Sequence, residues 1–131
     1  MLTGSFTSGE STMDKNDVLR VRGYPEVITC LTEADMKPKG IRAWILQGQR
    51  HQLVFFEMDS SAVVPEHSHD YPQWGIMVDG KMELTVDGQP HIVDKGDEYL
   101  IPAGAKHFAR FFGKCRVMDL FSEKSRYQAK K

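Results

Sequence analysis

Two histidines separated by one residue, with a glutamine four residues further on, are the part of this chain best suited to chemistry. They are His67, His69 and Gln73, in the stretch "PEHSHDYPQWG". Residues two apart in a strand point to the same face, so the two imidazoles would project side by side. Imidazole nitrogens bind zinc- and iron-type ions at about 2.0–2.1 Å. The stretch therefore predicts half of a metal site, although polar residues at an exposed strand end would give the same pattern.

A third histidine follows in "GDEYLIPAGAKHFARF". Pro102 and Gly104 favour a tight turn, and His107 would begin the strand after it. Taken alone, His107 would more often be a hydrogen-bonded or exposed residue than a ligand. Its interest comes from the possibility that it completes the set begun by His67 and His69.

One carboxylate near the C-terminus lies among apolar residues, in "CRVMDLFSEKSRY". Strand alternation puts Cys115, Val117, Asp119 and Phe121 on one face. Asp119 is therefore either an outward-facing residue or an acid–base group placed inside the protein. Both interpretations are open from the sequence.

These residues lie among many short strand-like runs that begin at Ile41. The runs are rich in β-branched and aromatic residues, and turn residues separate them. Asp-Gly, a strong hairpin signal, occurs at residues 79–80 and again at 87–88. No long stretch has a helical period. The pattern predicts an all-β fold, an antiparallel sandwich or barrel, with residues 15–131 as a single domain.

The segments before Ile41 carry weaker signals. Residues 1–14 are rich in Ser, Thr and Gly and are predicted to be a disordered lead. Between residues 18 and 40, Gly and Pro break the pattern, and "TEADM" fits either a short strand or a helical turn.

The composition fits a soluble globular protein. The 131 residues are 40% hydrophobic and 27% charged, with a net charge of -1. This balance argues against binding nucleic acid or an anionic membrane surface, since both favour basic proteins. No window resembles a membrane span or a secretory signal. Cys30 and Cys115 form no CxxC pair and are predicted to be reduced thiols in a cytoplasmic protein.

The two histidine stretches together resemble the two motifs of the cupin superfamily. The first motif reads HxH(x)3–4E(x)6G, and the second reads G(x)5PxG(x)2H. The matching positions are His67, His69, Gln73, Gly80, Gly96, Pro102, Gly104 and His107. The fourth ligand is Gln73 where the family usually has Glu, and Phe111 stands where the second motif often ends in Asn.

This resemblance covers about residues 52–121 and implies a small double-sheet antiparallel β-barrel of the jelly-roll type. It implies a divalent transition metal in the interior, which could be Zn, Ni, Fe, Co or Mn. It also suggests a homodimer. The implied metal ligands are His67, His69, Gln73 and His107.

The glutamine affects the charge of the implied site. Three neutral imidazoles and a neutral amide leave a divalent ion with its full charge, whereas Glu would remove one unit. Such an ion should attract an anionic small-molecule substrate and lower the pKa of bound water. It should also resist oxidation, so Gln73 favours Lewis-acid chemistry over redox chemistry.

The C-terminal residues resemble a narrower subgroup, the single-domain cupins that linearise 4,5-unsaturated uronates during pectin and alginate breakdown. The resemblance rests on HSHxxxQ and on Asp-x-Phe-Ser followed by an arginine. It implies an acid–base role for Asp119, a binding role for Phe121 and a catalytic role for Arg126, which lies one residue later than the subgroup spacing. The implied function is a metal-dependent isomerase-like enzyme acting on unsaturated uronates or a related sugar acid.

Two other functions remain open. The first is an iron-dependent cupin dioxygenase, which the absence of a carboxylate ligand disfavours. The second is a non-catalytic module that binds a small molecule or a metal. Trp74 and Arg110 have the opposite parity to the ligands and are expected to pack or face outward instead of entering the site.

Overall fold

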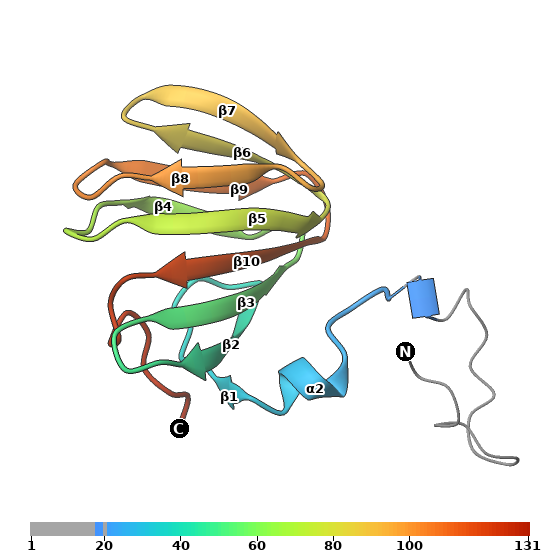
Figure 1. Ribbon diagram of the computed structural model, residues 1–131. Helices are drawn as coiled ribbons and strands as arrows, with labels where there is room; N and C mark the ends of the chain where they lie inside the picture. Colours follow the sequence, from blue (N-terminus) through green and yellow to red (C-terminus); the bar gives the residue numbers. More distant parts are fainter. Residues whose placement is uncertain (1–17, 20) are drawn as a thin grey trace, which may run out of the picture.

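Two antiparallel sheets face each other in the computed structural model, which describes residues 18, 19 and 21–131 (Figure 1). The predicted lead, residues 1–14, lies outside the described residues. The larger sheet has the strand order β1-β2-β3-β10-β5-β8 and the smaller one β4-β9-β6-β7. The strands are β1 (Thr32–Glu33), β2 (Ile41–Gln47), β3 (Gln52–Met58), β4 (Val63–His67), β5 (Gln73–Asp79), β6 (Lys81–Val86), β7 (Gln89–Asp94), β8 (Glu98–Ile101), β9 (His107–Phe111) and β10 (Cys115–Phe121).

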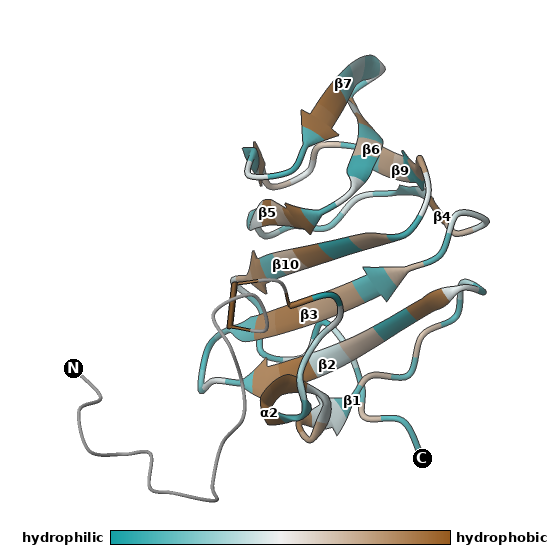
Figure 2. Cartoon of the chain, turned by 90° about the vertical axis from the view of Figure 1, so that its right-hand side faces the viewer, coloured by the Kyte–Doolittle hydropathy of each residue, from teal (hydrophilic) through white to brown (hydrophobic). Residues whose placement is uncertain are grey.

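The core lies between the two sheets and follows strand alternation. In β10 every second residue is buried, namely Cys115, Val117, Asp119 and Phe121. Strand β3, which pairs with β10, buries every second residue in the same way. Figure 2 shows both hydrophobic and hydrophilic stretches along the strands, for example in β3 and β10. The prediction of an all-β, double-sheet barrel is confirmed.

The two Asp-Gly pairs have different roles, and the hairpin prediction is right for one of them. Asp87 and Gly88 join the paired strands β6 and β7, with φ values of 48° and 81°. Positive φ at both positions is the geometry of a two-residue hairpin. Asp79 and Gly80 instead connect β5 in one sheet to β6 in the other. A Cβ on Gly80 would lie 2.6 Å from the carbonyl oxygen of Lys114, so this corner has no room for a side chain.

The ambiguous N-terminal region contains a short helix, α2 (Glu26–Thr29), followed by β1. "TEADM" thus begins as a strand and not as a helical turn. The C-terminal segment, residues 122–130, returns beside β1 (Figure 1). The Asp35 amide donates to the Gln128 carbonyl at 2.8 Å, and the Lys130 amide donates to the Glu33 carbonyl at 2.8 Å. This pairing places the end of the chain beside β1, at one edge of the larger sheet.

Cys30 is exposed, Cys115 is buried, and both are free thiols. Within the described ranges, no helix combines the length and the hydropathy needed to cross a membrane.

Candidate metal centre and its cavity

Three histidines meet at one end of the barrel. His67 ends β4, His107 begins β9, and the two are paired across the strands. His69 lies in the loop after β4, so the expectation that His67 and His69 share one strand is wrong. The ring nitrogens that the three side chains offer nevertheless all lie within 4.8 Å of one another. Small side-chain adjustments would bring such a group onto one ion.

Backbone carbonyls orient all three rings. The Nδ1 atoms of His67, His69 and His107 lie 2.9, 2.7 and 2.9 Å from the carbonyl oxygens of Pro65, Tyr71 and Ala105. A carbonyl oxygen only accepts, so each Nδ1 carries the proton and each Nε2 is unprotonated and can act as an acceptor or a ligand. Metal-ligating histidines are commonly oriented by such a bond from the other ring nitrogen. The donor set therefore fits a transition metal ion.

Burial favours the neutral form of two of these histidines, His67 and His107. His107 is only 3% exposed, and its Nε2 atom has no hydrogen-bond partner within the described part of the chain. Burial lowers the pKa of His107 to about 4 and also lowers the pKa of His67. Since a metal binds only the neutral imidazole, protons compete weakly with it near neutral pH.

Gln73 lies with the histidines, as predicted. It is the buried first residue of β5, and its Oε1 atom lies 3.2 Å from Nε2 of His69. With the proton of His69 on Nδ1, both of these atoms are acceptors. On its other side, the Gln73 side chain lies close enough to Asp119 to lower the pKa of that carboxyl. Only the amide nitrogen can donate toward a carboxylate, so the amide oxygen is left for the histidines and can serve as a fourth ligand.

Asp119 faces the interior, which the sequence left open. It is 6% exposed, and the Tyr99 hydroxyl donates to its Oδ1 atom at 2.5 Å. Burial raises the pKa of Asp119 to about 7, against the opposing effects of Tyr99 and Gln73. Burial also raises the pKa of Tyr99, so the phenol keeps its proton.

Tyr99 was missed by the sequence reasoning, although Gly75 was a signal for it. A glycine in the middle of a strand often marks a close approach by another group. A Cβ on Gly75 would collide with Asp119 Oδ1 and with the Tyr99 ring. The contact between Tyr99 and Asp119 therefore requires glycine at position 75.

Arg126 reaches the centre from the C-terminal segment. Its Nη2 atom lies 3.3 Å from Nε2 of His67, and its Nε atom is buried without a partner. The guanidinium carbon lies 4.6 Å from the ring centre of Tyr127 and 5.6 Å from that of Phe121. Among the described residues, no carboxylate forms an ion pair with Arg126. An unpaired guanidinium in such a place is suited to bind an anion.

Gln52 holds the C-terminal segment in place and is a second residue that the sequence reasoning missed. It is 1% exposed. Its amide nitrogen donates to the carbonyls of Lys124 and Tyr127, both at 3.0 Å, and its Oε1 accepts from the Tyr127 amide at 2.9 Å. Gln52 thus fixes the backbone immediately beside Arg126.

Replacing Gln52 with methionine should loosen this segment. The change leaves buried backbone groups unpaired, so we expect the free energy of unfolding to fall by about 3 kcal/mol. Metal content should be unchanged, because Gln52 does not contact the histidines. Denaturant melts and elemental analysis test this, with the exposed Gln49→Met as a control. Equal stability of the two variants would refute the anchoring role.

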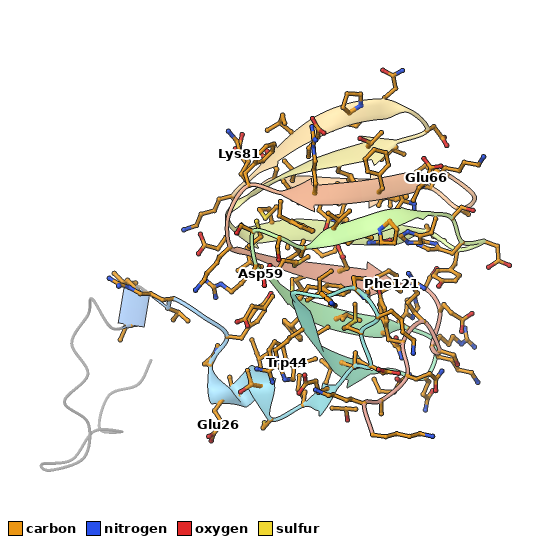
Figure 3. The ribbon with its side chains drawn as sticks, turned by 180° about the vertical axis from the view of Figure 1, so that it is seen from behind. Glu26, Trp44, Asp59, Glu66, Lys81 and Phe121 are labelled. Atoms are coloured by element: carbon orange, nitrogen blue, oxygen red, sulfur yellow. The ribbon has the colours of Figure 1, made fainter. Side chains whose placement is uncertain are left out.

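A cavity of about 490 Å³ extends from this centre into the barrel. It is lined by His67, Gln73, His107, Asp119, Phe121 and Arg126, together with apolar residues from both sheets. Figure 3 shows Phe121 and Glu66 toward one end of the barrel, and Lys81 and Asp59 toward the other. The centre thus occupies the end near Phe121.

Trp74 and Arg110 do not line the cavity. The Trp74 indole donates to Glu98 at 3.0 Å, and the exposed Arg110 donates to Glu83 at 2.8 Å. Arg110 is outward-facing, as expected. Trp74 is half-buried on the outer face of the larger sheet and not in the core.

The chain is similar in sequence or fold to several known proteins. The chain is 38% identical over 64 residues to quercetin 2,3-dioxygenase of Bacillus subtilis (strain 168), covering 48% of this chain and 19% of that protein. It thus spans about a fifth of the length of that relative.

Two solved structures are also similar. KdgF from Halomonas sp. is 28% identical, with a TM-score of 0.64 over 70% of this chain and 86% of that one. An RmlC-like cupin from Shewanella frigidimarina NCIMB 400 is 24% identical, with a TM-score of 0.66 over 72% of this chain and 86% of that one.

The match that decides the family is to the cupin domain itself. It covers residues 54–121, which is just over half of the chain. That range begins in β3 and ends with the last residue of β10, so it includes all three histidines, Gln73 and Asp119. The chain belongs to the cupin family.

Proposed function

We propose that this protein is a metal-dependent enzyme that opens the ring of 4,5-unsaturated uronates, or of a related sugar acid, and converts the resulting enol to a ketone. The observation that carries the proposal is the position of Asp119. Its carboxylate is buried in the cavity beside Gln73, whose amide oxygen lies 3.2 Å from Nε2 of His69. An acid–base group thus lies directly beside the candidate metal ligands.

The proposed reaction moves protons and changes no oxidation state overall. The anomeric hydroxyl loses its proton, the bond from that carbon to the ring oxygen breaks, and the ring oxygen gains a proton, so an aldehyde and an enol form. The enol then loses its hydroxyl proton while the neighbouring carbon gains one, which gives the ketone. Asp119 is the group placed to transfer these protons, and Tyr99 holds its carboxylate in position.

The other residues of the site bind and orient the substrate. Arg126, which forms no ion pair with a described carboxylate, would take the substrate carboxylate, and Phe121 would support the ring. A divalent ion held by His67, His69, His107 and Gln73 would supply Lewis-acid stabilisation of developing negative charge on oxygen. The neutral Gln73 leaves the charge of that ion uncancelled by a ligand.

A second function is favoured by one comparison. The chain is 38% identical to quercetin 2,3-dioxygenase over the matched residues, compared with 28% for KdgF. This similarity supports a dioxygenase that uses iron or a similar metal. Against it stands Gln73, because common non-haem iron oxygenase sites include a carboxylate ligand.

Assays with a 4,5-unsaturated galacturonate separate the two functions. With metal-loaded protein, we expect the ultraviolet absorbance of the conjugated enol ether to disappear at least about 100-fold faster than in buffer, as acid–base catalysis requires. Oxygen consumption should not change. Oxygen uptake that depends on substrate would favour the dioxygenase, and no acceleration by fully loaded protein would refute the isomerase.

A further inference from the structure

The cavity continues well beyond the candidate metal centre. His107 begins β9 and Phe111 ends it, so the two lie about 13 Å apart along the strand. Phe111 and Met82 are opposite each other in the smaller sheet, at the end of the barrel where Figure 3 shows Lys81. Both of these side chains line the cavity. One continuous space therefore joins a polar end to a second, distant end.

The walls at that distant end are apolar. We call this part the apolar chamber, and its lining residues are Met58, Met82, Leu84, Ala109, Phe111 and Val117. None of these side chains offers a strong hydrogen bond. Buried water needs two to four polar partners, so the chamber is poorly suited to hold it. Sugar hydroxyls placed there would lose their hydrogen bonds to water without replacement.

The polar end, in contrast, is suited to an anion. The Nε atom of Arg126 is buried without a hydrogen-bond partner among the described residues, and none of the described carboxylates forms an ion pair with this side chain. Because the two ends belong to one cavity, a single molecule can satisfy both. Such a molecule carries an acidic head and an apolar body.

We propose that the site binds carboxylic acids whose body is an alkyl or aryl group, with the carboxylate at Arg126 and the body in the apolar chamber. The position of the head rests on the proposed function, whereas the position of the body rests on the chamber alone. Acids of this class would fill the cavity more completely than a free monosaccharide.

Straight-chain carboxylates from acetate to octanoate are the probe. Calorimetric titration of the metal-loaded protein should show tighter binding by about fourfold for each added methylene until the chamber is full. Affinity that does not depend on chain length would overturn the proposal.

Two variants should change, in opposite directions, the chain length at which affinity stops rising. Ala109→Leu places a larger side chain on the wall and leaves less space in the chamber, so the rise in affinity should stop at a shorter acid. Met82→Ala places a smaller side chain there and enlarges the chamber, so the rise should continue to a longer acid. General destabilisation cannot change this chain length in opposite directions. If the chain length stayed the same in both folded variants, the proposal would be overturned.

A third variant tests the head. Arg126→Met should weaken all of the acids by a similar factor and leave the gain per methylene unchanged. Unaltered affinities would show that the head lies elsewhere and overturn the proposal. Because these experiments measure binding, their result is separate from uronate turnover. Chain-length dependence without turnover would refute the proposed function alone, and turnover without chain-length dependence would refute this inference alone.

Discussion

Replacement of His107 with alanine is expected to reduce metal affinity by at least about 100-fold. Loss of a residue that only orients a ligand already costs 10- to 100-fold, so loss of a ligand should cost at least the upper value. His107 is the most buried of the three histidines, and its Nε2 atom has no other partner. The remaining side chains cannot easily replace it, because both neighbouring rings are held by their own backbone carbonyls.

The measurement is metal titration of the metal-free protein, followed by elemental analysis after dialysis. His91→Ala is the matched control, since His91 is exposed on β7 and does not line the cavity. This control should bind metal like the unaltered protein. If His107→Ala kept full affinity while remaining folded, the three-histidine centre would be wrong.

Replacement of Asp119 with asparagine is expected to lower turnover of the unsaturated uronate by about 100- to 10,000-fold, the usual contribution of a general acid–base group. Asparagine has the same shape, and its amide oxygen can still accept from Tyr99. It cannot transfer the proton, however. The metal content should stay near that of the unaltered protein, because Asp119 contacts Gln73 and none of the histidine nitrogens that face the centre.

Asp94→Asn is the control for this variant, because Asp94 lies exposed on β7, away from the cavity. Turnover and metal content are measured on the same preparations. Full turnover in Asp119→Asn would remove Asp119 from the mechanism. Loss of metal in parallel with turnover would instead give Asp119 a structural role at the centre.

Local sequence was sufficient to predict the strands and the four candidate ligands. Alternation of apolar and polar residues is a property of neighbouring positions, so the runs after Ile41 predicted strands that the structure contains. The four candidate ligands came from the resemblance to the two cupin motifs. Each motif is a short run with fixed spacing, so the first one identifies His67, His69 and Gln73 and the second identifies His107.

Alternation could not decide which face of a strand is inside. It placed Asp119 with Val117 and Phe121, but a strand viewed alone has two equivalent faces. The smaller sheet lies over this face of the larger sheet, which made it the interior one. The same limit applies to the Asp-Gly pair at 79–80, because a turn does not reveal whether the next strand stays in the same sheet.

The remaining parts of the site depend on contacts between residues far apart in the chain. Tyr99 and Asp119 are 20 positions apart, His67 and Arg126 are 59 apart, and Gln52 and Tyr127 are 75 apart. No local pattern encodes such pairs, since each depends on strand order and on the return of the C-terminal segment. The sequence by itself determined the strands and the set of candidate metal ligands. Only the tertiary structure decided that Asp119 faces inward, that Arg126 lies beside His67, and that an apolar chamber extends behind the centre.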